Sequence, residues 1–338
     1  MYIDNTIIKD LRVLTEEFIP SRLLHRDSQI STIRDNLAPL VDKQKARNMF
    51  LYGPPGIGKT SLSKFIVEEL KSHVAILSSY VNCWNAASEF KVLYNILHDF
   101  GQSFVHRKGI PTDELIDQVK KKLDRPCVII LDEVDQLKSD KILYELLGLN
   151  IGLILIANKE TALSGLEDRV RSRFAAADHI EFQAYREGEI FDILKDRREW
   201  GLVKGSTSNG LLESIASISG GDCRFAIDVL RIVAEEAEKK DLEKIPEDFV
   251  DKFVPKAKSE SASTVIGRLN DHQKIMYEIV KQKQSIDPQE FYKEFNKKCK
   301  EAGLELIVDR TARKYLEKLA SYNLIKFKGE GKGRSYSI

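Results

Sequence analysis

Eight consecutive residues, GPPGIGKT from Gly53 to Thr60, have the composition and spacing needed to hold a chain of phosphates. The glycines let the backbone curl so that its N–H groups face phosphate oxygens, and the ammonium of Lys59 adds a point charge there. The Thr60 hydroxyl is suited to bind Mg²⁺. A chance glycine turn is disfavoured, because a short apolar strand precedes this segment and a helical pattern follows it. We therefore expect ATP or ADP with Mg²⁺. The residues expected to contact the nucleotide here are Pro55, Gly56, Ile57, Gly58, Lys59, Thr60 and Ser61.

A second acidic motif, LDEVD at 131–135, ends a continuous apolar run. This is the position of a Walker B motif, in which Asp132 would hold Mg²⁺, directly or through water, and Glu133 would polarise the attacking water. The alternative, a solvated acidic loop, is disfavoured by the phosphate-binding motif upstream. Asn158 ends the next apolar run and is expected to hydrogen-bond the attacking water or the γ-phosphate.

Arginines at two places complete the candidate chemistry. Arg169, Arg171 and Arg173 crowd into DRVRSRF, and one of them could project into the ATP site of a neighbouring subunit. A solvated basic loop is the alternative. Arg224 lies in the first turn of a predicted helix, where the helix dipole disfavours a cation. That position indicates an anionic partner, such as the γ-phosphate.

The elements that must position these residues alternate between strand and helix patterns in the first half of the chain. Apolar runs at 47–52, 73–79, 127–132, 151–158 and 179–185 predict strands, and the segments between them have helical spacing. This alternation is typical of a parallel, doubly wound α/β sheet. We assign residues 1–185 to a nucleotide-binding α/β domain of the AAA+ P-loop type.

The remainder of the chain predicts two further domains. Residues 186–256 have only helical patterns and indicate a small all-helical lid, and the polar segment 254–263 is a candidate linker. Residues 264–338 predict three helices, at about 269–283, 288–302 and 309–322, followed by two short strands around a Gly/Lys turn. This is the outline of a winged helix-turn-helix domain.

Charge is concentrated at the C-terminal end. The chain has a net charge of +1, but residues 262–338 contain 16 Lys and Arg against 10 Asp and Glu. A winged helix places its third helix in the major groove and its hairpin against the flanking backbone. Leu316, Leu319 and Tyr315 are expected to pack inward. The residues expected to contact DNA are Arg310, Thr311, Arg313 and Lys314 of the third helix, with Lys328, Lys332 and Arg334 of the wing. A winged helix used for protein contacts is the alternative.

Composition limits the class of protein. No apolar run approaches the roughly 20 residues that span a bilayer, and the N-terminus lacks a signal-peptide core. A cytoplasmic location without membrane partners is therefore expected. The four cysteines lie far apart without metal-ligand spacing, so we expect neither a metal cluster nor disulfides.

With these motifs considered together, the chain resembles archaeal origin-recognition initiators of the Orc/Cdc family over nearly its whole length. The generic AAA+ motifs are widely shared, so the resemblance depends on their combination with more specific segments. These segments are FIPSRLLHRDSQI, YVNCWNAASEF, GIPTDEL, RVRSRF and GGDCRFAIDVL, together with the C-terminal winged helix.

The resemblance implies an ATPase with slow, regulatory hydrolysis that binds double-stranded origin DNA and helps load the replicative helicase, with other initiator subunits as further partners and association with the nucleoid. It implies that the segment with Ile19, Pro20 and Arg26 encloses adenine, and that Tyr185 adds a nucleotide contact. It also implies that Arg224 is the sensor 2 residue of the lid.

The resemblance further implies an initiator-specific helix between Tyr94 and about Ile110 that touches DNA, with Arg107 as a phosphate contact. Arg173 is the first choice for the arginine finger and Arg171 the second.

Two other interpretations of the protein's function remain open. One is an AAA+ motor with rapid turnover in a ring, which should lack a basic winged helix. The other is a signalling ATPase whose winged helix makes protein contacts.

Overall fold

The computed structural model describes residues 7–16, 18–103, 110–267, 269–322, 324–329 and 335–338. The chain divides into two compact units, Met1–Lys252 and Phe253–Ile338.

The first unit contains a five-stranded parallel sheet in the order β2-β3-β4-β1-β5. Strands β3 and β4 are buried along their whole length, which is why their sequences are continuous apolar runs without alternation. The strands are β1 (Met49–Tyr52), β2 (Leu77–Asn82), β3 (Cys127–Asp132), β4 (Gly152–Ala157) and β5 (Asp178–Glu181).

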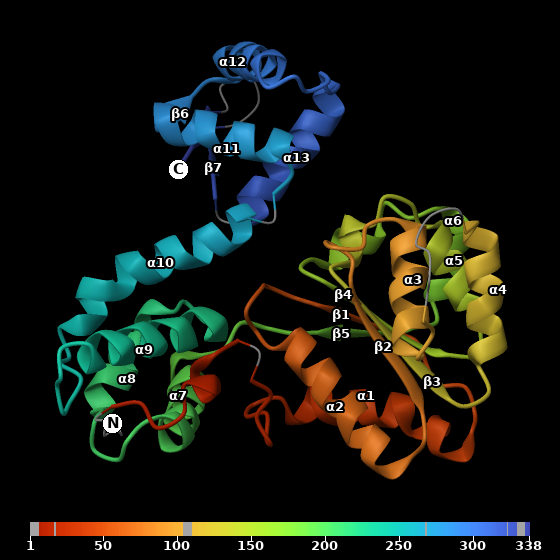
Figure 1. Ribbon diagram of the computed structural model, residues 1–338, viewed down its shortest axis with the longest axis horizontal. Helices are drawn as coiled ribbons and strands as arrows, with labels where there is room; N and C mark the ends of the chain where they lie inside the picture. The colour runs from red at the N-terminus through yellow and green to blue at the C-terminus, as the bar shows by residue number, and fades with distance from the viewer. Residues whose placement is uncertain (1–6, 17, 104–109, 268, 323, 330–334) are drawn as a thin grey trace. The chain divides into compact units, whose positions relative to one another are not determined.

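Helices cover both faces of this sheet, as Figure 1 shows. On one face the apolar side chains of α3 to α6 form a continuous core with residues such as Phe50, Ile129 and Leu155. The alternate strand residues, among them Leu51 and Ile130, are left for the opposite face, where α1 and α2 lie. The helices are α1 (Asp27–Leu37), α2 (Lys59–His73), α3 (Glu89–Asp99), α4 (Thr112–Lys122), α5 (Lys141–Leu147) and α6 (Asp168–Phe174).

The strand order brings the candidate motifs together. In a parallel sheet all strands end at the same edge, and β4 lies between β1 and β3. The P-loop after β1, the acidic pair after β3 and Asn158 after β4 therefore meet at one edge. The register places Tyr52 beside Ala157, so that Gly53 and Asn158 leave the sheet side by side.

The lid of the first unit is helical. Helices α7 (Glu187–Gly201), α8 (Asn209–Ile218) and α9 (Cys223–Glu238) pack on one another, and the 3-10 turn Leu11–Leu14 near the N-terminus packs on α7 and α9. The Arg197 guanidinium donates to the carbonyl of Val13 at 2.7 Å. The N-terminal segment is thus held on the lid rather than on the sheet domain.

The second unit contains a winged helix. Three helices surround an aromatic core in which Phe291 stacks on Phe295 and meets Tyr336 edge-on, with ring centroids 6.1 Å and 5.0 Å apart. An antiparallel sheet in the order β6-β8-β7 completes it. The elements are α11 (Asp271–Lys283), β6 (Ser285–Ile286), α12 (Pro288–Glu301), α13 (Asp309–Ser321), β7 (Lys326–Lys328) and β8 (Ser335–Ser337).

The predicted fold class is confirmed, with local differences. The strand expected at 73–79 begins only at Leu77, because α2 continues to His73 and β2 starts where it pairs with β3 at Cys127. The strand expected to reach residue 185 ends at Glu181. The candidate linker 254–263 is helical, since α10 (Phe249–Gly267) runs through it with Pro255 inside. Among the described residues, no helix is long and apolar enough to cross a membrane.

Candidate nucleotide site and candidate DNA-binding residues

The P-loop adopts backbone angles that require glycine at two positions. Gly56 has φ +76° and Gly58 has φ +90°, both in the left-handed region. Gly58 is the residue before α2, so the turn directs the first N–H groups of that helix toward the loop. A helix N-terminus with unpaired N–H groups is an anion-binding site. The sequence prediction of a phosphate cradle therefore matches the local geometry.

Lys59 is buried at the centre of this turn, with 6% of its surface exposed. Its ammonium donates to the carbonyls of Gly53 and Pro54, both at 2.7 Å, and to Oδ1 of Asn158 at 3.3 Å. Burial lowers the pKa of Lys59 to about 8, although the nearby Asp132 carboxylate opposes the shift. The ammonium thus links the ends of β1 and β4.

The Asp132 carboxylate joins the P-loop helix to the β3 edge. Its Oδ2 accepts from the Thr60 hydroxyl at 2.6 Å and from the Tyr80 hydroxyl at 2.9 Å. Its Oδ1 accepts from the backbone N–H of Glu133 at 2.9 Å. Glu133 itself has φ +53°, a strained conformation for a residue with a side chain, as is frequent at functional sites. The structure therefore brings together the two predicted magnesium-binding residues, Thr60 and Asp132.

The lid touches the P-loop through the start of α9. The backbone N–H groups of Cys223 and Arg224 donate to the Gly56 carbonyl at 3.1 Å and 3.4 Å. Asp222 caps α9 by accepting from the N–H of Phe225, and a Cβ at residue 56 would overlap with the Asp222 carboxylate. Gly56 is thus required by the lid as well as by the turn.

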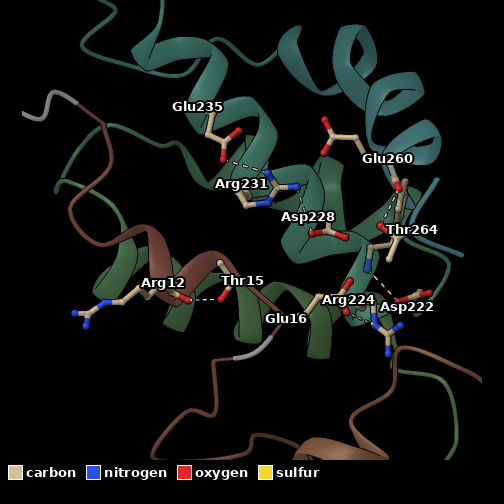
Figure 2. A network of polar contacts seen from close by, with 11 residues as sticks. Arg12, Thr15, Glu16, Asp222, Arg224, Asp228, Arg231, Glu235, Glu260 and Thr264 are labelled. Atoms are coloured by element: carbon tan, nitrogen blue, oxygen red, sulfur yellow. Dashed lines mark hydrogen bonds and ion pairs between the residues drawn. The ribbon is translucent and has the colours of Figure 1, made fainter. Parts of the chain in front are cut away.

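Arg224 is close to this contact but its side chain is engaged elsewhere. Its Nε lies 3.4 Å from Oε2 of Glu16, which follows the 3-10 turn at the N-terminus (Figure 2). The two side chains are 47% and 44% exposed. Ion pairs of this exposure contribute at most about 1 kcal/mol, so a phosphate is able to compete for the arginine.

The segment expected to enclose adenine contains one residue with a structural role that the sequence did not indicate. Arg26 is buried and donates to the carbonyls of Ile57, at 3.2 Å, and Gln183, at 2.9 Å. Its guanidinium lies 3.8 Å from the ring centroid of Tyr185. Pro20 is buried and Ile19 is exposed. Arg26 therefore ties this segment to the P-loop and to the chain that leads into the lid.

The three clustered arginines lie on helix α6, not on a loop. Arg169 and Arg173, one turn apart, both lie over the ring of Tyr144, at 5.0 Å and 4.0 Å from its centroid. Arg173 also donates to the Tyr144 hydroxyl at 3.0 Å. Arg171 pairs instead with Asp168 on its own helix. Arg173 is thus held against Tyr144 of α5, whereas Arg171 is paired within α6. Both remain candidates for the finger.

Helix α13 presents the predicted DNA-contacting residues on its outer face. Ala312, Leu316 and Leu319 are buried and face the core, as expected for the two leucines, whereas Arg310 and Arg313 are exposed. Thr311 is half-buried, while Lys314 and the wing residue Lys328 are exposed. The predicted contacts Arg107, Lys332 and Arg334 lie outside the described residues.

Comparison with known proteins identifies the family. Residues 42–163 match the model of an AAA domain, and residues 191–253 match that of the Cdc6 AAA+ ATPase-type lid domain. ORC1-type DNA replication protein 9 of Halobacterium salinarum is 34% identical over 341 residues, covering 100% of this chain and 95% of the relative. ORC1-type DNA replication protein 1 of the same organism is 39% identical over 290 residues, covering 85% and 94%. The chain belongs to the ORC1-type DNA replication proteins. It is therefore an AAA+ ATPase and a replication initiator.

Solved structures agree with this fold. The Aeropyrum pernix ORC1 protein in complex with DNA has a TM-score of 0.83 at 23% identity, covering 99% of this chain and 94% of that one. The Aeropyrum pernix ORC2 protein, in its ADPNP–ADP complexes, has a TM-score of 0.67 at 24% identity, covering 98% and 94%. At this identity the two structures support the fold of the ORC1-type chain and no finer detail.

Several contacts of this ORC1-type site were not predicted from the sequence. Tyr80 lies in the YVNC segment that contributed to the resemblance. The alternation of side chains along β2 is the signal that would have placed the Tyr80 side chain on the same face of the sheet as Asp132. Glu16 and Tyr144 carry no comparable signal, because each meets its arginine only through the fold.

The ion pair between Arg224 and Glu16 leads to a prediction. We expect Arg224→Ala to abolish the difference in protease sensitivity between the ATP-bound and ADP-bound forms, because the sequence predicts that this arginine contacts the γ-phosphate. Glu16→Gln, the matched change on the partner, should keep the difference and raise ATP affinity by no more than about fivefold, the value of an exposed pair. Limited proteolysis with each nucleotide measures both. An unchanged difference in Arg224→Ala would make the arginine a surface residue of α9.

Proposed function

We propose that this protein uses ATP, bound with Mg²⁺ and hydrolysed slowly, as a switch for binding origin DNA and helping to load the replicative helicase. The observation that carries the nucleotide part is the hydrogen bond between Thr60 and Asp132, which joins the P-loop to the acidic motif of β3. Because the Thr60 proton points to Asp132, the lone pairs of its oxygen remain available to a cation.

The residues present fit a magnesium ion. Mg²⁺ prefers oxygen ligands and in nucleotide sites usually combines one or two protein oxygens with phosphates and water. Thr60 Oγ1 is the direct ligand in this proposal, and Asp132 holds a bound water or the ion itself. The ion supplies charge neutralisation at the β- and γ-phosphates.

The remaining groups have separate roles in this proposal. The Lys59 ammonium, which donates hydrogen bonds to three oxygens, turns toward the phosphates when the nucleotide binds. Asn158 then holds the attacking water or the γ-phosphate. Glu133 accepts the proton of that water or orients it. An arginine finger, Arg173 before Arg171, is supplied by a neighbouring subunit, which makes other initiator subunits partners of the protein.

Two substitutions test the nucleotide site. We expect Lys59→Ala to weaken ATP binding at least about tenfold, because it removes charge-assisted hydrogen bonds to phosphate. We expect Glu133→Gln to bind ATP normally and to slow hydrolysis about 100-fold or more, the usual effect of losing a general base. Equilibrium binding and single-turnover hydrolysis measure the two effects. Lys71→Ala, an exposed lysine on the same helix, is the matched control. Parental hydrolysis in Glu133→Gln would disprove its role.

We further propose that α13 and the wing of the C-terminal unit bind the DNA. Arg310, Arg313 and Lys314 recur at helical spacing on the face of α13 opposite its buried residues, and Lys328 is exposed on β7. The Aeropyrum pernix ORC1 protein, which has the same fold, was solved in complex with DNA, and this supports DNA binding as such. A protein that binds chromosomal DNA in this way would be associated with the nucleoid in the cytoplasm.

The distinction between base and phosphate contacts is testable. Arg313→Ala should cost roughly 1–3 kcal/mol on the cognate site and less on random DNA, because a forked guanidinium reads base edges. Lys328→Ala should weaken both DNAs about equally and reduce the salt slope by about one unit. The cognate site is first located by footprinting the purified protein on its own genome, and both variants are then titrated across a salt series.

The control for these titrations is Lys239→Ala on the lid, an exposed lysine paired with Glu236. Equal loss of cognate and random binding in Arg313→Ala would refute its base contact. No loss in either DNA-facing variant would favour a winged helix that makes protein contacts.

A further inference from the structure

A tyrosine on the neighbouring strand contacts the acidic motif directly. Tyr80 lies in β2 opposite Ile130 of β3, two residues before the position where Asn82 pairs with Asp132. Its hydroxyl reaches Oδ2 of Asp132 at 2.9 Å.

The hydrogen bonds of Asp132 leave little freedom for its carboxylate. A carboxylate has about four lone-pair sites. The described donors occupy three of them: Thr60 and Tyr80 on Oδ2, and the N–H of Glu133 on Oδ1. The carboxylate is therefore fixed in orientation, with one site available to a metal ion or to its bound water.

The phenol ring is itself held from the P-loop helix. Nζ of Lys64 lies 3.6 Å from the centroid of the Tyr80 ring, in the geometry of a cation–π contact. Lys64 lies one turn beyond Thr60 on α2. Helix α2 thus contacts the Tyr80 ring through Lys64 and the Asp132 carboxylate through Thr60. Tyr80 and Asp132 are in turn hydrogen-bonded to each other.

We propose that Tyr80 is a positioning residue for magnesium-dependent ATP binding, acting through the orientation of Asp132. This inference rests on the proposed function, because it assumes that Asp132 serves Mg²⁺. With Phe at this position, the ring keeps its place beneath Lys64, but Oδ2 retains only the Thr60 donor. The carboxylate then rotates more freely and its remaining lone pair no longer points to one place.

The test compares ATP binding by Tyr80→Phe and the parent protein across a Mg²⁺ titration and in EDTA. We expect the Mg²⁺ concentration for half-maximal binding to rise about tenfold, the effect of one hydrogen bond to a charged group, with affinity in EDTA unchanged. Tyr52→Phe is the control, because it removes a phenol from β1 of the same sheet and keeps the stacking on Phe50. It should change neither value.

A double-mutant cycle separates positioning from a general effect on the fold. In an Asp132→Asn background, Tyr80→Phe should add little to the loss, because the hydroxyl acts through the carboxylate. Additive losses, or equal weakening with and without Mg²⁺, would overturn the inference. A parent that binds ATP without regard to Mg²⁺ would remove the magnesium part of the proposed function and this inference with it. A Mg²⁺-dependent parent with unaffected Tyr80→Phe would overturn the inference alone.

Discussion

A buried ammonium needs oxygen partners, and the first unit is organised to give them to Lys59. Leaving such a charge unpaired away from water costs several kcal/mol, which is a large part of the stability of a domain. Its three acceptors come from the turn after β1 and from Asn158 after β4. They meet only because β1 and β4 are parallel neighbours in register. The hydrogen bonds that hold the Lys59 ammonium therefore depend on the strand order of the sheet.

The hydrogen-bond network around Lys59 continues across the sheet through the hydroxyl groups of two side chains. Thr60 follows Lys59 on α2 and carries the network to Asp132 at the end of β3, and Tyr80 carries it to β2. Four neighbouring strands thus contribute to one polar network at their carboxyl edge. Such a network stiffens the site before any ligand binds, which lowers the entropy lost on binding.

The sequence predicted the parts of this site that depend on local pattern. The P-loop is contiguous, and the buried strands β3 and β4 are apolar along their whole length, so Asp132 and Asn158 could be placed at strand ends. The start of β2 was misplaced because Val74 to Ile76 are apolar but lie between a helix end and the first paired residue. Arg26 was expected at adenine, and its ties to Ile57 and Gln183 could not be foreseen. Those partners are 31 and 157 residues away and are backbone carbonyls, which carry no sequence signal.

The lid contacts the P-loop through backbone atoms, whereas its Arg224 side chain pairs with the N-terminal segment. The backbone N–H groups at the start of α9 bind the Gly56 carbonyl, so this part of the lid meets the P-loop through atoms that no side-chain substitution removes. The Arg224 side chain, in contrast, is engaged with Glu16, whose neighbouring turn packs on α7 and α9. A γ-phosphate that captured Arg224 would release Glu16 as well. The N-terminal segment would then respond to the nucleotide state together with the lid, because Glu16 and the γ-phosphate would compete for the same guanidinium.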